Sequence, residues 1–326
     1  MDADLADWIA ELREHARTHP ARAPLYLLFT AYLSVWYAIT SRVPLGRNVY
    51  DSDWDLLVVL DACRVDTLRE VAPEYEFIDE VDEAYSVGSQ SAEWMVNTFT
   101  ESRREEIGRT AYISGNGFSE TVFVDGQYPP VNNAVPIDLS SWSVVDESAF
   151  GAHRTVWETD HDEAYGSVLP AAMTDHAIDA GRNGDADRII VHYTQPHLPY
   201  AGAAYREDRE PTEVERRGYE LLEEGAATRE AVYEAYRETL RWVLDDVAEL
   251  LENVDAENVV ITSDHGEAFG EWRAYGHPEG FPHPAVKKVP WVETTATDEG
   301  TREPDLETGS SVDTDIQEHL RDLGYR

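Results

Sequence analysis

The chain has 326 residues and carries 65 Asp and Glu against 26 Lys and Arg, a formal net charge of −39 at pH 7. This excess of acid excludes nucleic acid as a partner, because a phosphate backbone needs a basic stripe and the sequence contains none. The 9 Trp and 17 Tyr distinguish it from a disordered acidic tail. We interpret the composition as a halophilic surface, whose self-repulsion is screened at high salt.

Residues 1–45 are expected to form an N-terminal helical segment of two helices. The single cysteine, Cys63, cannot make an intrachain disulfide, and no basic region precedes an apolar core at the N-terminus, so we expect a cytoplasmic protein. Residues 23–41 are uncharged and approach the length of a membrane span. Their aromatic and hydroxyl content favours a packed or interfacial helix instead, which makes peripheral membrane association a hypothesis.

A continuous apolar run over residues 56–60 predicts a strand that is buried on both faces and ends at Asp61. After it we expect, in chain order, a helix over residues 64–71, a loop over 85–91, a helix over 92–99, short strands over 111–114 and 121–124, and an irregular insertion over 126–143.

The second half continues the alternation of helices and strands. We expect a helix over residues 164–181, a strand over 188–193, two helices over 212–253 broken near Gly225, a strand over 259–262, a polar acidic segment over 294–311 and a short helix over 313–323. This order predicts an α/β fold with a mostly parallel sheet flanked by helices on both faces. The main domain then spans residues 46–295, and residues 296–326 form an acidic C-terminal tail.

Two of the predicted strands end in residue types that bind metal ions. Asp61 ends the first strand, and Asp264 and His265 follow the strand over 259–262. The ligand crevice of a parallel sheet lies outside the carboxyl ends of its strands, so we expect these three side chains to converge on a divalent cation such as Zn²⁺, Mn²⁺, Mg²⁺ or Ca²⁺. Two structural alternatives are that Asp61 caps the next helix and that residues 264–267 form a capped turn.

A serine hydroxyl is the candidate nucleophile for group transfer. Ser89 and Ser91 directly precede the helix over 92–99, and the N-terminus of a helix favours an anionic phosphate or sulfate. A serine in this place is also an ordinary helix N-cap, so the position alone does not choose between capping and catalysis.

Four segments occur in an order and spacing typical of one family. They are VVLDACRVDTL at residues 58–68, a serine segment before an apolar helix ending Thr98-Phe99-Thr100, HYTQPHLPY at 192–200 and TSDHGEAFGE at 262–271. Because of these four segments, the chain resembles the sulfatase-like members of the alkaline phosphatase superfamily over about residues 50–295. The resemblance implies an alkaline-phosphatase-like fold, metal ligation by Asp61, Ser91, Asp264 and His265, and Ser91 as nucleophile, with Ser89 as the alternative.

The resemblance also implies roles for histidines. His197 corresponds to a histidine that contacts the transferred group or a second ion, although without the resemblance it would be interpreted as a loop histidine. His277 corresponds to another group-binding histidine, suited to protonate the leaving oxygen if its pKa is near neutral, and His283 competes for that role. We expect His192, inside its strand, to be a core histidine and not a ligand.

Departures from the family pattern favour phosphate over sulfate. Sulfatases usually carry paired acids at the first strand, Asp-Asn at the last, and a Cys-Xaa-Pro-Xaa-Arg sequence oxidised to formylglycine, whereas Cys63 here is followed by Arg-Val-Asp. The resemblance implies a metal-dependent hydrolase of phosphate or sulfate monoesters or diesters, either small molecules or linked to a glycan or lipid. The alternatives are a phospho-group transferase acting on lipid or glycan head groups at the membrane, and a non-catalytic member of the fold.

Overall fold

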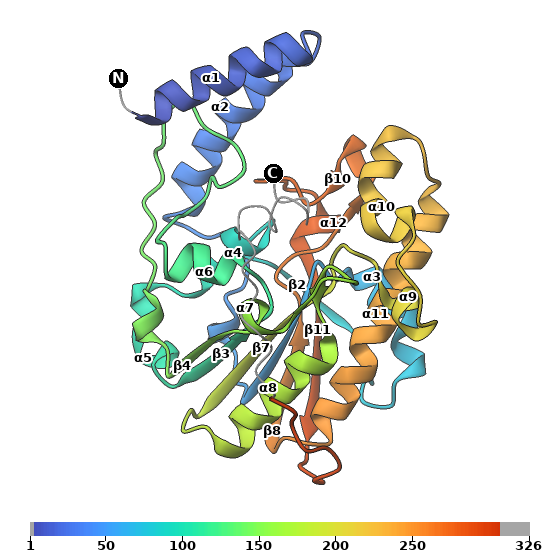
Figure 1. The fold of residues 1–326 in the computed structure, drawn as a ribbon. Helices are drawn as coiled ribbons and strands as arrows, with labels where there is room; N and C mark the ends of the chain where they lie inside the picture. Colours follow the sequence, from blue (N-terminus) through green and yellow to red (C-terminus); the bar gives the residue numbers. More distant parts are fainter. Residues whose placement is uncertain (1–2, 307–326) are drawn as a thin grey trace.

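The computed structural model describes residues 3–306, with a seven-stranded sheet of order β2-β11-β8-β1-β7-β3-β4 at its centre (Figure 1). The strands of this sheet are β1 (Leu56–Asp61), β2 (Asp82–Tyr85), β3 (Thr110–Ser114), β4 (Ala152–Thr155), β7 (Arg188–Pro196), β8 (Ala256–Thr262) and β11 (Lys288–Ala296). β8, β1, β7, β3 and β4 run parallel, while β11 is antiparallel to both β8 and β2. The predicted α/β class with a mostly parallel sheet is confirmed.

Strand β1 lies in the middle of the sheet, and its side chains alternate between two cores. Leu56, Val58 and Leu60 enter one core, and Leu57 and Val59 enter the other. The first core is covered by α3 (Val65–Val71), α8 (Pro170–Asn183) and α11 (Arg229–Leu251), and the second by α4 (Ser91–Thr98), α5 (Arg104–Ile107) and α6 (Phe118–Phe123). A strand covered on both faces requires an uninterrupted apolar run, which explains the sequence of β1.

The shorter elements lie around this frame. They are α7 (Trp157–Asp160), α9 (Gly202–Arg206), α10 (Glu213–Glu224), α12 (Pro284–Lys287), the two-stranded sheet of β5 (His161–Asp162) with β6 (Ser167–Val168), and that of β9 (Ala268–Phe269) with β10 (Tyr275–Gly276). The predicted break between two helices near Gly225 is confirmed, since Gly225 ends α10 with a φ of 71°. Only glycine adopts this left-handed conformation without strain.

The predicted N-terminal helices are α1 (Ala3–Thr18) and α2 (Ala23–Thr40), which form a hairpin projecting from the main body (Figure 1). Leu33 and Tyr37 of α2 pack against Val135 and Trp142 of the irregular insertion. Among residues 3–306, α2 is the one helix long and apolar enough to span a membrane, and only 28% of it is buried. It therefore packs on the protein by one side and exposes the other.

Several predicted elements differ in the structure. Residues 121–124 are not a strand: 121–123 belong to α6 and Val124 follows it. The helix starts where Asn116 Oδ1 accepts a hydrogen bond from the Phe118 amide at 2.9 Å. The helix buries Phe118 and Phe123, and this packing overrides the strand propensity of the β-branched residues between them. The helix predicted from residue 164 begins only at Pro170.

At the C-terminal side, β11 continues to Ala296, beyond the predicted domain boundary at residue 295. The acidic segment after it is held to the body, because Arg302 contacts Asp175 at 2.8 Å and Asp246 at 3.7 Å. The short helix predicted over residues 313–323 lies outside the described residues.

Candidate metal and catalytic site

The candidate site lies at the carboxyl edge of the central strands. Asp61 ends β1, and Asp264 and His265 follow the neighbouring β8. Directly after Asp61 the backbone turns sharply, because Ala62 adopts a φ of 61°, which is uncommon for a residue with a Cβ. The turn directs the Ala62 amide to Asp264 Oδ1 at 3.2 Å and so ties the two strand ends together.

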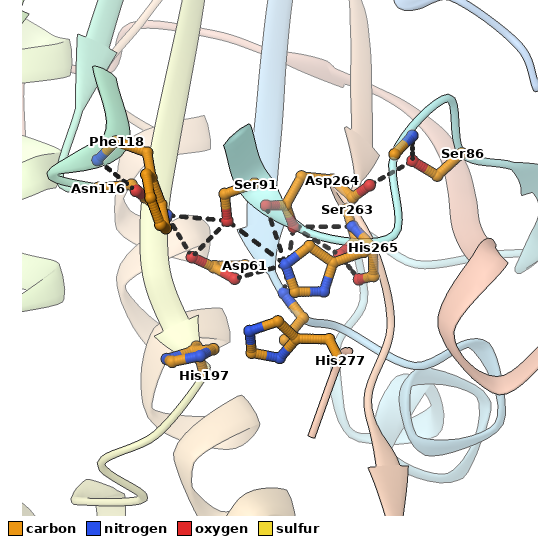
Figure 2. Close-up of polar contacts among 12 residues, drawn as sticks. Asp61, Ser86, Ser91, Asn116, Phe118, His197, Ser263, Asp264, His265 and His277 are labelled. Atoms are coloured by element: carbon orange, nitrogen blue, oxygen red, sulfur yellow. Dashed lines mark hydrogen bonds and ion pairs between the residues drawn. The ribbon is translucent and has the colours of Figure 1, made fainter. Parts of the chain in front are cut away.

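Figure 2 shows the four residues predicted as metal ligands converging on one point. The hydroxyl oxygen of Ser91 lies 3.5 Å from Asp61 Oδ2 and 3.3 Å from His265 Nε2. The same His265 nitrogen lies 3.4 Å from Asp61 Oδ1 and 3.4 Å from Asp264 Oδ2. All four residues are at most 1% exposed. The structure thus brings together side chains that are far apart in the sequence.

This set of donor atoms fits a divalent cation. Four ligands placed about 2.0–2.1 Å from a tetrahedral ion are separated from one another by about 3.4 Å. The distances from His265 Nε2 to the Ser91 hydroxyl, to Asp61 Oδ1 and to Asp264 Oδ2 are close to this value. Asp264 Oδ2 accepts no hydrogen bond within residues 3–306, although it is completely buried. A buried carboxylate oxygen that accepts no hydrogen bond is costly, and a bound ion would offset that cost.

His192 contributes to the same cluster from β7. As predicted, it lies inside its strand and is fully buried. Its Nδ1 lies 2.9 Å from the hydroxyl of Tyr112, and its Nε2 faces Asp264 Oδ2 at 3.5 Å. Its nearest ligand atom lies within 4.8 Å of those of Asp61 and Asp264. The sequence did not predict this contact, because it depends on β7 pairing directly with β1.

A second group of possible ligands adjoins the first and consists of His197, Glu267 and His277, whose ligand atoms lie within 4.8 Å of one another. His277 Nδ1 is 3.2 Å from Glu267 Oε1, and the His277 ring is 4.5 Å from that of His265. The structure therefore places both predicted histidines, His197 and His277, at the site (Figure 2). Glu267 was missed, although its place three residues after Asp264 was a usable signal.

Burial determines the protonation of these histidines and of Glu267. Desolvation lowers the pKa of His265 and of His277 to about 4, and it raises the pKa of Glu267 to about 7. The histidines are then neutral at pH 7, which is the form that binds metal. The expectation of a near-neutral pKa for His277 is wrong, because an imidazole excluded from water loses its proton more readily.

The carboxylate of Asp264 behaves differently from that of Glu267. Burial disfavours its charge, but its contacts with His265 and His192 outweigh this cost and hold the pKa of Asp264 below its usual range. Asp264 is therefore ionised, as a metal ligand must be.

Asn116 is a site residue that sequence reasoning missed. Its Nδ2 donates to Asp61 Oδ2 at 2.7 Å and to the Ser91 hydroxyl at 3.0 Å. It follows β3 at the same edge of the sheet, so the strand-end argument that identified Asp61 would also have identified Asn116. Its amide fixes the relative position of the serine oxygen and the carboxylate.

The two alternatives left open by the sequence lie elsewhere. The Ser89 hydroxyl donates to Glu93 Oε2 at 2.7 Å and accepts from the Gly280 amide at 2.9 Å. These contacts stabilise the loop before α4, and neither of them is with Asp61 or Asp264. His283 accepts a hydrogen bond from the Ala285 amide at 3.0 Å and caps α12. The geometry therefore places Ser91, and not Ser89, beside Asp61.

No protein-family model matches the sequence, and a search of curated proteins finds no match. Solved structures with some likeness include the soluble domain of lipooligosaccharide phosphoethanolamine transferase A from Neisseria meningitidis (16% identity, 80% of this chain and 79% of that chain, TM-score 0.48). They also include the lipoteichoic acid synthase LtaP from Listeria monocytogenes (11%, 86% and 81%, 0.41) and a 2-O GAG sulfatase (13%, 82% and 70%, 0.41). At these identities the likeness assigns no activity to this chain.

Proposed function

We propose that this protein is a metal-dependent hydrolase of phosphate esters that uses Ser91 as its nucleophile. The observation that carries the proposal is the position of the Ser91 hydroxyl, 3.5 Å from Asp61 and 3.3 Å from His265, at the first residue of α4. A nucleophile beside metal-ligand side chains, at a helix start that favours an anion, is the arrangement that phosphoryl transfer requires.

Asp61, Asp264, His265 and Ser91 are the residues that would hold the ion. A divalent cation bound there lowers the pKa of a hydroxyl and neutralises charge on the ester oxygens. Asn116 holds the serine oxygen and the Asp61 carboxylate in fixed positions relative to each other through its two hydrogen bonds.

The chemical step follows from the same contacts. The Ser91 oxygen forms a bond to phosphorus as the bond from phosphorus to the leaving oxygen breaks, and Asp61 Oδ2 at 3.5 Å is an acceptor for the serine proton. Water, or an acceptor hydroxyl, then releases the phosphate from Ser91. The second group, His197, Glu267 and His277, would bind the oxygens of the transferred group or a second ion.

His277 would act as a neutral imidazole in this scheme. Glu267 Oε1, 3.2 Å from His277 Nδ1, orients the ring. Because the pKa of Glu267 is raised to about 7, this pair can retain a proton near neutral pH even though His277 alone does not. The pair is therefore our candidate source of the proton for the leaving oxygen.

We favour phosphate over sulfate because Ser91 is followed by Ala-Glu-Trp, which lacks the formylglycine sequence of sulfatases. A second candidate function is transfer of a phospho group to a lipid or glycan at a membrane. The observation that favours it is the exposed apolar side of α2, a helix whose Phe29 lines a cavity together with His277. Both candidates fit a halophilic protein with a metal-binding site and an alkaline-phosphatase-like fold.

The test is an assay of purified protein at molar salt on aryl phosphate and aryl sulfate esters, before and after chelation and after addition of Zn²⁺, Mn²⁺, Mg²⁺ or Ca²⁺. We expect turnover of the phosphate ester that requires metal and is lost in Ser91→Ala. Ser89→Ala is the matched control and should retain turnover. Activity that survives both chelation and Ser91→Ala would exclude the proposal, and bound metal without turnover of any ester would indicate a non-catalytic member of the fold.

A further inference from the structure

One side of α2 carries a stripe of exposed apolar residues, which we call the α2 face. Its members are spaced by three and four positions and are between 38% and 67% exposed: Leu25, Leu28, Tyr32, Val35 and Ile39. Ile137 and Leu139 of the irregular insertion are also exposed, and Arg42, just after the helix, donates to the Leu139 carbonyl at 2.8 Å. Single exposed apolar residues are ordinary on a protein surface, but a continuous stripe marks an interaction site.

The stretch of sequence that contains α2 is basic, unlike the rest of the chain. Between Glu14 and Asp51 the sequence contains four arginines, Arg17, Arg22, Arg42 and Arg47, and no Asp or Glu. In a chain with a net charge of −39 this is the segment that an anionic surface attracts. Arg17 and Arg22 lie before α2 and Arg42 lies after it, so basic side chains stand at both ends of the apolar stripe. Arg17 pairs with Glu14 at 2.7 Å and Arg22 with Glu223 at 3.8 Å, but both ion pairs are exposed, so lipid phosphates can compete for these arginines.

We propose that the α2 face docks on an anionic lipid surface, with α2 lying in the plane of the interface. Apolar side chains enter the boundary of head groups and acyl chains, and the flanking arginines contact the lipid phosphates. The acidic body does not prevent this contact, because charges further away than about 10 Å are screened at 0.1 M salt, and over shorter distances at higher salt.

Contacts on the opposite side of α2 exclude a membrane-spanning orientation. Trp36 Nε1 donates to Glu93 Oε1 at 2.7 Å. Leu33 and Tyr37 are buried in the same contact. A helix fixed to the protein along one side can lie on a bilayer but cannot cross it.

A second copy of the chain is a less suitable occupant than lipid. Pairing two α2 faces would bring the arginines at the ends of α2 in both copies together. This repulsion between like charges opposes association. An anionic lipid surface instead complements the arginines and accepts the apolar stripe.

The docking surface is close to the candidate site. Phe29 of α2 lines a cavity of about 390 Å³ together with Asn133, Tyr219, Tyr275 and His277. If the proposed phosphoesterase function holds, docking places this cavity beside the lipid surface, so that an ester with an apolar tail could enter it. The docking itself does not depend on that function.

The experiment is co-sedimentation of the full chain with vesicles of phosphatidylglycerol or of phosphatidylcholine, at the lowest salt at which circular dichroism shows the protein folded. We expect binding to phosphatidylglycerol that weakens at molar salt. Leu28→Glu should reduce it about tenfold or more, since it replaces a buried apolar contact with a charge. Val124→Glu is the matched control, because Val124 is 49% exposed but lies after α6, and it should bind like the wild type.

A further variant tests the arginines. Arg22→Gln should reduce the preference for phosphatidylglycerol over phosphatidylcholine without unfolding the protein, because Arg22 is exposed. Equal binding by Leu28→Glu and the wild type would overturn the proposal. So would a wild-type dimer in analytical ultracentrifugation that Leu28→Glu dissociates, if neither form binds vesicles. No ester is used in these measurements, so their failure leaves the chemistry at Ser91 untouched.

Discussion

The hydroxyl oxygen of Ser91 lies 3.3 Å from Nε2 of His265, although the two residues are 174 positions apart in the chain. Ser91 is brought there as the first residue of α4, and His265 by the turn after β8. Because β8 is paired with β1, the same turn also meets Asp61. The rigid sheet thus sets the separations between the donor atoms, which is the condition for a preorganised metal site.

Metal binding should stabilise the folded protein. Without an ion, the carboxylates of Asp61 and Asp264 are buried close together. An ion that binds only the folded state adds about 2.7 kcal/mol to the free energy of unfolding when its concentration is 100 times its Kd. The expected result is a rise in Tm on adding metal to chelated protein, followed by circular dichroism. Asp264→Asn should abolish this rise, and Glu252→Gln, an exposed change at the end of α11, should not. An equal rise in all three proteins would place the ion elsewhere.

Asn116 should act as a positioning residue. Asn116→Ala removes the donor to Asp61 and to Ser91, and loss of such a supporting contact typically costs about 10-fold to 100-fold in activity or metal affinity. We expect kcat to fall by this amount while KM changes little. Asn183→Ala, which removes an exposed amide contact to Asp179, is the control and should be neutral. If Asn116→Ala lost stability but kept its kcat, the role would be structural only.

Much of this architecture could be predicted from the sequence. The central strands are buried on both faces, so β1 and the end of β8 are nearly continuous apolar runs that are visible without coordinates. The rule that ligands gather at the carboxyl ends of parallel strands then identified Asp61, Asp264 and His265, and the structure brings these residues together.

Other features depend on packing that no local pattern encodes. Residues 121–123 have strand propensity but form helix, because Phe118 and Phe123 fill the core beside α4. The contact of His192 with Asp264 follows from the order of strands in the sheet, which the sequence alone leaves open. The lowered pKa of His277 follows from burial, which depends on the whole fold.

The hydrogen bond between Tyr112 and His192 should support metal binding. Tyr112→Phe removes the hydroxyl 2.9 Å from His192 Nδ1, which frees the ring beside Asp264 and leaves a buried nitrogen without its partner. We expect a loss of about 1–3 kcal/mol in the free energy of unfolding and about a tenfold loss of metal affinity. Urea denaturation and calorimetric titration measure the two quantities.

Tyr193→Phe provides the matched control for Tyr112→Phe. Tyr193 is equally buried, and its hydroxyl lies 2.8 Å from that of Thr174 in the other core, away from the site. The Tyr193→Phe variant should be less stable than the wild type but should bind metal with the same affinity. Equal metal affinities for the two variants would show that the Tyr112 hydroxyl does not support metal binding by holding His192 against Asp264.

Trp36 should couple the N-terminal hairpin to the nucleophile loop. Its indole donates to Glu93, a fully buried carboxylate that also accepts from the Ser89 amide at 2.8 Å. Trp36→Phe leaves Glu93 Oε1 without this donor, at a cost of about 1–3 kcal/mol in stability, and loosens the loop that leads to Ser91. We expect kcat to fall together with stability. Trp142→Phe, which removes the contact to the Pro129 carbonyl at 2.8 Å, should lower stability and leave kcat unchanged.

The buried carboxyl group of Asp246 should make the folded protein more stable at acidic pH than at alkaline pH. Burial, together with nearby acids, raises its pKa from 3.8 to about 7 against the opposing effect of Arg302. Between about pH 4 and 7 the folded state therefore binds a proton that the unfolded state has lost, so the contribution of this group is full below pH 4 and disappears as the pH rises through 7.

Asp246→Asn tests this linkage because an amide has no proton to lose. The variant should be more stable than the wild type at pH 8, by as much as about 4 kcal/mol at 1.36 kcal/mol per pKa unit, and the difference should shrink toward pH 4. Urea denaturation at several pH values, in constant high salt, measures it. Glu252→Gln is the control, and its free energy of unfolding should change with pH in the same way as that of the wild type. A pH-independent difference for Asp246→Asn would mean that the carboxyl group is ionised in the folded protein throughout this range, with Arg302 as its counter-ion at 3.7 Å.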